Sequence, residues 1–272
     1  MATRFAMFID TSKCMACRGC QVACKQWNDL RGYVPGVRET TQRGTYENPP
    51  SLDPETYTRI RFIEHEDGDE LQWLFLKEGC MHCGDPACVG ACPTGALKQD
   101  ATTGLVTFER ELCNGCGYCT QFCPYHVPQL DVVNPLTGEA KSSKCTFCQD
   151  RTLNGLKPAC VKTCPAGALD WGNRDEMVAK AEARVRELKE ERGMPNANVY
   201  GDTQLGGLGR IYVLKADPEV YGLDPDPAYP VTETVWQKFL QPIGEVVFGA
   251  TIVGAITAFF LARRNVRMEE VE

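Results

Sequence analysis

The arrangement of cysteines constrains this chain more than any other feature. The sequence has 16 cysteines in 272 residues, and they fall into four groups with none left over. The groups are Cys14, Cys17, Cys20 and Cys24; Cys80, Cys83, Cys88 and Cys92; Cys113, Cys116, Cys119 and Cys123; and Cys145, Cys148, Cys160 and Cys164. Disulfide frameworks are typical of short secreted chains without a sizeable core, so a chain of this length favours metal centres.

The spacing within the groups indicates iron–sulfur clusters. The third group reads C-x2-C-x2-C-x3-C-P, the run found in bacterial two-cluster ferredoxins, and the second and fourth groups repeat it with a longer middle loop. The first group has Lys25 in place of the proline. We expect the fourth cysteine to begin a helix, with proline in its first turn, and to face another cluster. Zinc shares the C-x2-C spacing but does not explain the x3-C-P endings.

Sixteen thiolates predict four [4Fe–4S] clusters with no open iron, and therefore an electron-transfer role without catalytic residues. The fourth cysteine of each motif ligates the neighbouring cluster, so the motifs must be paired. Chain order pairs the second motif with the third and the first with the fourth. The predicted ligand sets are Cys14, Cys17, Cys20 and Cys164; Cys145, Cys148, Cys160 and Cys24; Cys80, Cys83, Cys88 and Cys123; and Cys113, Cys116, Cys119 and Cys92.

The predicted fold class is α+β, with two nested two-cluster ferredoxin units in residues 1–235. An insertion at 25–79 is expected to contain a β-hairpin, because Tyr57–His65 and Leu71–Lys77 alternate apolar and polar residues. An extension at 166–235 is expected to contain a helix over Asn173–Arg192 and a strand over Ile211–Lys215. A further strand is predicted over Leu105–Phe108.

Some single residues have a structural and a functional interpretation. The helix stripe of Met177, Ala181, Val185 and Leu188 predicts packing. His82 and His126 lie beside cluster ligands and are interpreted as packing or surface residues, with tuning of a cluster as the alternative. The tryptophans Trp27, Trp73 and Trp171 are expected in the core.

The C-terminal part, 236–272, is predicted to hold one transmembrane helix at about 241–262. The 17 uncharged residues from Val246 to Ala262 span roughly 26 Å, and the turn from Gln241 completes a bilayer crossing. Trp236 and Lys238 precede the helix, and it is followed by Arg263, Arg264 and Arg267. The positive-inside rule then places the C-terminus in the cytoplasm and the clusters on the periplasmic or outer side.

The net charge and the N-terminal residues bear on the partners of the chain. The net charge of -7 argues against a nucleic-acid partner, which requires a basic surface. Residues Met1–Asp10 do not have the pattern of a secretory signal, so the cluster domain would need a partner for export.

The motifs together resemble the iron–sulfur (β) subunit of membrane-bound respiratory formate dehydrogenases. The resemblance lies in CMACRGCQVACKQW, GCMHCGDPACVGAC, CNGCGYCTQFCP and PACVKTCPAGALDWG, and in the C-terminal helix. It implies a molybdenum or tungsten pterin subunit that oxidises formate and bears a twin-arginine export signal. It also implies a haem b membrane subunit that reduces quinone.

Three alternatives remain open. An equivalent subunit of a hydrogenase, or of a polysulfide or thiosulfate reductase, would have nearly the same motifs. A protein whose clusters only brace a scaffold, and a zinc-stapled binding module, are the other two.

Overall fold

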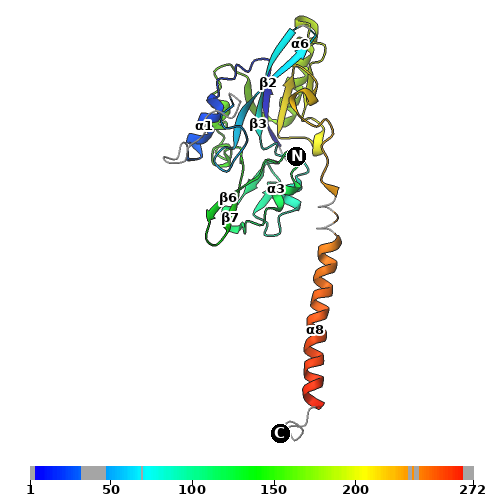
Figure 1. The fold of residues 1–272 in the computed structure, drawn as a ribbon. Coiled ribbons are helices and arrows are strands. Elements are labelled where there is room, and N and C mark those ends of the chain that lie inside the picture. Colours follow the sequence, from blue (N-terminus) through cyan, green and yellow to red (C-terminus); the bar gives the residue numbers. More distant parts are fainter. Residues whose placement is uncertain (1–3, 32–46, 69, 232–234, 236–238, 266–272) are drawn as a thin grey trace. The chain divides into compact units, whose positions relative to one another are not determined.

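A computed structural model describes residues 4–31, 47–68, 70–231, 235 and 239–265. The chain divides into two compact units, Met1–Ala228 and Tyr229–Glu272 (Figure 1). The first unit contains all the cysteines, and the second contains the apolar C-terminal helix.

The first unit is organised around a four-stranded mixed sheet with the order β8-β1-β10-β9. Its strands are β1 (Phe5–Asp10), β8 (Leu169–Asn173), β9 (Asn198–Tyr200) and β10 (Arg210–Leu214). The first strand pairs parallel with β10 and antiparallel with β8. The sheet therefore joins the start of the chain to the segment that follows the last cysteine motif.

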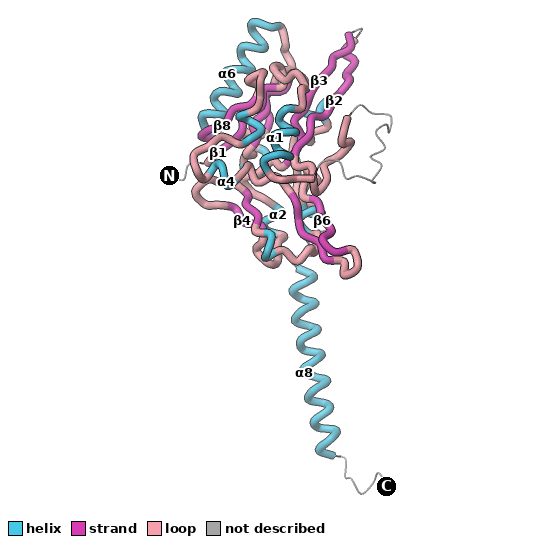
Figure 2. The backbone as a smooth tube through the Cα atoms, turned by 90° about the vertical axis from the view of Figure 1, so that its left-hand side faces the viewer, coloured by secondary structure: helices cyan, strands magenta, loops and turns pink. Residues whose placement is uncertain are grey.

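The two faces of this sheet pack against different partners. Helix α6 (Arg174–Arg192) covers one face, where Ala6 and Phe8 of β1 pack with the buried stripe of the helix (Figure 2). Asn173 caps the helix by accepting a hydrogen bond from the Asp175 N–H, and Gly193 ends it in the left-handed conformation. The predicted packing role of the stripe Met177, Ala181, Val185 and Leu188 is confirmed.

The hairpin of β2 (Thr58–Asp67) and β3 (Glu70–Gly79) packs on the other face. Ile60 and Leu76 of the hairpin share a core with Met7 and Ile9, because successive residues of β1 point to opposite faces. The two sequence stretches with alternating polarity form this hairpin.

The expectation that Trp27 and Trp73 lie in the core is wrong, because their side chains are 45% and 52% exposed. Trp27 instead stacks on the guanidinium of Arg151 and donates from Nε1 to Asp150. Trp73 pairs with Glu64 in the half of the hairpin near its turn, where its ring contacts Phe62 and Phe75. Of the three tryptophans, Trp171 packs against the core that contains Met7 and Ile9, as expected. Aromatic residues with a polar tip are stable at such half-exposed positions.

Shorter elements support the cysteine loops. They are two antiparallel pairs, β4 (Leu97–Gln99) with β5 (Val106–Phe108) and β6 (Gln129–Asn134) with β7 (Glu139–Ser143). The α-helices are α1 (Gly19–Trp27), α2 (Ala87–Gly90), α3 (Tyr118–Phe122), α4 (Gln149–Thr152) and α5 (Ala159–Lys162). The 3-10 helices are η1 (Arg110–Leu112), η2 (Gln204–Gly206) and η3 (Pro218–Tyr221).

The prediction that the fourth cysteine begins a helix is wrong. In motifs two to four the helix contains the third cysteine and ends before the fourth, at Gly90, Phe122 and Lys162. A residue that precedes proline is disfavoured in the helical region, so the cysteine before the proline cannot extend the helix. The first motif has Lys25 at this place, and α1 accordingly continues through Cys24 to Trp27.

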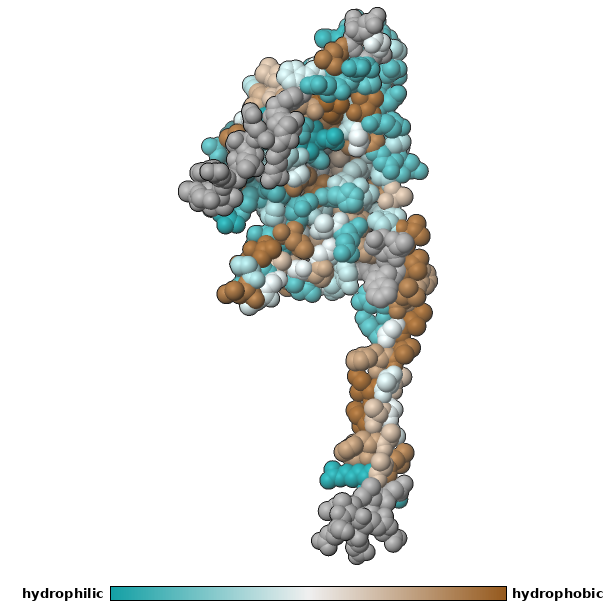
Figure 3. Space-filling view, viewed as in Figure 1, coloured by the Kyte–Doolittle hydropathy of each residue, from teal (hydrophilic) through white to brown (hydrophobic). Residues whose placement is uncertain are grey.

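The second unit consists mainly of helix α8 (Gln241–Asn265). Within the described residues, its segment Gln241–Arg264 is the one helix that is long and apolar enough to cross a membrane, and its side chains are exposed along its length. Figure 3 shows the apolar side chains of this helix. The predicted crossing at 241–262 lies within it. Trp236, Lys238 and Arg267, expected near its ends, are outside the described residues.

Candidate iron–sulfur centres

The four cysteine loops share one backbone feature. In each motif, the residue immediately before the second cysteine has a positive φ. These residues are Ala16 (φ 54), His82 (φ 48), Gly115 (φ 74) and Phe147 (φ 55). Only glycine adopts this region without cost, so three of the loops hold a non-glycine residue in a strained conformation. The repeat seen in the sequence is therefore also a repeat of backbone geometry.

Backbone N–H groups lie close to the sulfur atoms. In the fourth loop the Phe147 nitrogen lies 3.4 Å from the Cys145 Sγ, and from β7 the Ser142 nitrogen lies 3.3 Å from the Cys113 Sγ. Hydrogen bonds to sulfur are among the interactions that set the potential of an iron–sulfur cluster.

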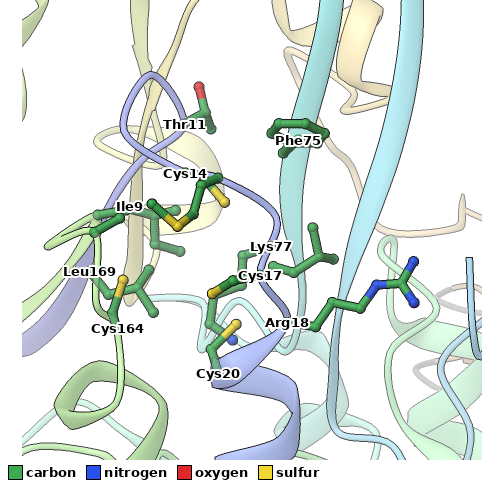
Figure 4. Close-up of a pocket in the computed structure, with 14 residues that line it drawn as sticks. Ile9, Thr11, Cys14, Cys17, Arg18, Cys20, Phe75, Lys77, Cys164 and Leu169 are labelled. Carbon is green, nitrogen blue, oxygen red and sulfur yellow. The ribbon is translucent and has the colours of Figure 1, made fainter.

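Three cavities are each lined by four cysteines that come from two different motifs. Cys14, Cys17 and Cys20 of the first motif line one cavity together with Cys164 of the last (Figure 4). The second and third cavities are lined by Cys24, Cys145, Cys148 and Cys160, and by Cys80, Cys83, Cys88 and Cys123. In all three cases one motif supplies three cysteines and another supplies the fourth.

The remaining four cysteines meet in a smaller core. Cys119 is buried with Leu97 and Val106, and Cys92 packs against this group. The sulfurs of Cys113 and Cys116 lie close enough to Cys119 for their charges to raise its pKa, although burial is the larger cause. The Cys119 Sγ also lies 3.4 Å from the hydroxyl of Ser142.

The donor set fits cubane clusters better than single ions. All sixteen cysteines are free. In the part of the chain that the structure describes, no three His, Cys, Asp or Glu side chains come close enough to hold one metal ion. Zinc–sulfur bonds of about 2.3 Å would require closely spaced sulfurs. Four thiolates spread around one cavity instead match the Cys₄ ligation of a [4Fe–4S] cluster.

Burial raises the pKa of eight of these thiols. Burial and the neighbouring Cys80 sulfur raise the pKa of Cys88 to about 12. The pKa of Cys148 is likewise raised to about 12, and that of Cys123 to about 11, with burial as the largest cause. Crowded buried sulfurs cannot all ionise without a cation between them, and bound iron supplies it.

Three buried cations lie beside the cysteine loops, and sequence analysis did not single them out. Lys77, Lys144 and Arg210 are 2%, 2% and 1% exposed. Lys77 lines the cavities of Cys14 and Cys24, and Arg210 lines the second of these. Lys144 donates to the carbonyl oxygens of Val106 and Cys145. Alternation along β3 assigns Lys77 only to one face of the hairpin, not to a buried site.

His82 and Phe147 bring two of the loops into contact. Their rings stack with centroids 4.0 Å apart. His82 is fully buried and accepts a hydrogen bond at Nδ1 from the Val106 N–H. The interpretation of His82 as a packing residue agrees with this stack, while His126 is exposed.

The fold and the cysteine loops define an electron-transfer protein of the ferredoxin type, and it holds four [4Fe–4S] clusters. Family profiles described as 4Fe-4S dicluster domains match residues 71–174 and 13–97. The chain is 42% identical over 271 residues to the formate dehydrogenase iron–sulfur subunit of Haemophilus influenzae, which covers 98% of this chain and 83% of that protein. It is also 42% identical over 271 residues to the iron–sulfur subunit of the nitrate-inducible formate dehydrogenase of Escherichia coli, covering 98% and 88%.

A third relative is the formate dehydrogenase 2 subunit beta (cytochrome c-553) of Nitratidesulfovibrio vulgaris, with 37% identity over 225 residues, 79% of this chain and 95% of that protein. The chain belongs to the family of formate dehydrogenase iron–sulfur subunits.

Proposed function

We propose that this chain transfers electrons between a formate-oxidising subunit with a molybdenum or tungsten pterin cofactor and a membrane subunit with haem b that reduces quinone. Each [4Fe–4S] cluster takes up and releases one electron. The observation that carries the proposal is the set of three cavities, each lined by four cysteines from two motifs. Such centres have no open iron for a substrate, so the chemistry on formate belongs to another chain.

The proposed ligand sets are those predicted by nesting the motifs. The cavity linings support the set of Cys14, Cys17, Cys20 and Cys164, the set of Cys145, Cys148, Cys160 and Cys24, and the set of Cys80, Cys83, Cys88 and Cys123. The core around Cys119 supports the set of Cys113, Cys116, Cys119 and Cys92. The two nested units are thus an inner pair within 80–123 and an outer pair formed by the motifs at 14–24 and 145–164.

The contacts between loops support an order for the four centres. The His82–Phe147 stack joins the Cys80 loop to the Cys145 loop, which puts these two centres in the middle. The charge of Cys119 acts on Cys88, which favours placing the Cys113 centre next to the Cys80 centre, at one end of the row. Lys77 lines both the Cys24 and the Cys14 cavities, which favours placing the Cys14 centre next to the Cys145 centre, at the opposite end. Cys17 and Cys116 are exposed, as ligands at two ends facing redox partners should be.

The proposed location is a single-pass anchor in the cell membrane with the clusters on the outer side. The apolar helix α8 ends with Arg263 and Arg264 in its last turn, which favours a cytoplasmic C-terminus. Proteolysis of spheroplasts should digest the cluster domain. A cluster domain that is protected until the cells are lysed would refute this orientation.

The test of function is a pull-down of the complex through this chain in mild detergent. The preparation should contain molybdenum or tungsten and should reduce a quinone analogue with formate as donor. An intact brown complex that uses hydrogen and not formate would assign the chain to a hydrogenase instead. A 34% identical relative over 228 residues, 79% of this chain and 65% of that protein, is named a hydrogenase-2 operon protein of Escherichia coli, so this control is necessary.

The ligand sets are tested by cysteine variants in the same complex. Cys164→Ala and Cys17→Ala should alter the same cluster signal in electron paramagnetic resonance (EPR). Cys24→Ala should alter the signal that Cys145→Ala alters. If Cys24→Ala and Cys17→Ala instead alter one signal, each motif holds all four ligands of its own cluster. That result would reject the nested arrangement.

A further inference from the structure

Lys77 is a positive charge in the core of the cluster domain. It lies near the end of β3, and its residue is 2% exposed. Its ammonium donates a hydrogen bond to the hydroxyl of Thr58 on the paired strand. Among the described residues, no carboxylate forms an ion pair with it. A buried charge without a counter-charge costs several kcal/mol, so an anion is expected nearby.

Arg210 makes this requirement stronger. It is 1% exposed and donates from Nη1 to the Lys77 carbonyl oxygen at 3.2 Å. Its charge acts on Lys77 and opposes the ammonium. Its Nε is buried and has no hydrogen-bond partner among the described residues. Two like charges are therefore held together in the interior, and one of them retains an unused donor.

The cysteines are the groups that surround this pair of charges. Lys77 lines the cavity of Cys14, Cys17, Cys20 and Cys164 and also the cavity of Cys24, Cys145, Cys148 and Cys160. Arg210 lines only the second. The anions that stabilise the pair are therefore the thiolates of these two centres.

We propose that Lys77 is a shared counter-charge of two neighbouring clusters and raises the reduction potential of both, while Arg210 acts on one of them. A cluster held by four thiolates carries net negative charge, and reduction adds one electron to it. A buried cation stabilises the reduced form more than the oxidised form. Local charge is one of the quantities that set cluster potentials. The inference rests on the ligand sets proposed above.

The test is a potentiometric titration followed by EPR on the complete complex with Lys77→Met. Two of the four clusters should become harder to reduce by about tenfold or more in the reduction equilibrium, which corresponds to about 59 mV for a one-electron couple. The iron content should stay unchanged. Lys77→Arg, which keeps the charge, should restore the potentials toward those of the wild type. Lys189→Met, on the exposed side of α6, is the matched control and should shift none.

Arg210→Gln gives an independent measurement if the neutral Lys77 variant does not assemble. It should lower the potential of one cluster only, the one whose signal Cys24→Ala alters, and Arg210→Lys should have a smaller effect. Unchanged potentials in fully loaded neutral variants would overturn the inference. An equal shift in Lys77→Arg and Lys77→Met would also overturn it, because the effect would then be structural. Failure of formate-driven reduction in the wild type would instead refute the proposed function and leave these shifts unaffected.

Discussion

Replacing Gly115 with alanine should selectively weaken one cluster site. Gly115 lies between Cys113 and Cys116 with a φ of +74, and an added Cβ would lie 2.3 Å from the Ala140 carbonyl oxygen on β7. Gly117, two residues further on, has a φ of +80, but its Cβ would meet only a Leu130 methyl group at 3.4 Å. The two variants therefore share the left-handed strain and differ in the clash with the backbone.

The expected costs follow from this geometry. A left-handed alanine costs about 1–2 kcal/mol, which is the whole expected effect of Gly117→Ala. Displacing packed backbone in Gly115→Ala adds about 1–3 kcal/mol, so the combined cost is about 2–5 kcal/mol. The displaced strand would also disturb the hydrogen bond from the Ser142 N–H to the Cys113 sulfur.

Denaturant-driven cluster release distinguishes the two variants. Gly115→Ala should lose the iron and the EPR signal of one cluster at lower denaturant than the other three, and Gly117→Ala should lose it later. The reasoning fails if both variants release this cluster at the same denaturant concentration. It also fails if Gly115→Ala destabilises all four clusters equally.

Three further predictions concern the surrounding fold. Asp10→Ala removes the buried carboxylate whose Oδ2 lies 2.8 Å from the Arg184 Nε, and it should lower the free energy of unfolding by about 3–5 kcal/mol. Glu187→Ala, the control, should change this free energy little. Denaturant unfolding measures both. Lys25→Pro should end α1 before Cys24, because the residue before a proline is disfavoured in the helical region. It should cost about 3 kcal/mol and lower the iron content, while Lys25→Ala should retain all clusters. The metal-free chain should bind iron more tightly as the pH rises from about 7 to 9, because thiols with a raised pKa must release protons to bind iron. Iron binding that is independent of pH would contradict this.

The sequence determined the local features of this protein. Helix α6 begins and ends as its capping residues predicted, because Asn173 and Gly193 act on the turns next to them. The stretch with alternating polarity forms β2 and β3, since period-two burial is a property of the strand itself. The cysteine spacing sufficed to predict four [4Fe–4S] clusters. The apolar C-terminal helix also followed from composition and length alone.

Sequence reasoning failed where a local rule was applied in the wrong direction or where exposure depends on packing. Proline after the fourth cysteine was interpreted as a helix start, but it ends the preceding helix by restricting the residue before it. The sequence interpretation places Trp27 in the core, yet Arg151, which follows it by more than a hundred residues, provides a partner at the surface.

Only the tertiary structure decided which charges and rings lie between the centres. Lys77 and Arg210 are 133 residues apart in the chain, and the two buried side chains meet only through tertiary packing. His82 and Phe147 likewise come from different motifs and meet only when the loops pack. Ligand identity is encoded by spacing over a few residues, whereas the electrostatic surroundings of a cluster arise from contacts between distant segments. The sequence therefore specified what the chain binds, and the packing of the sheet, the hairpin and the loops determined which residues surround it.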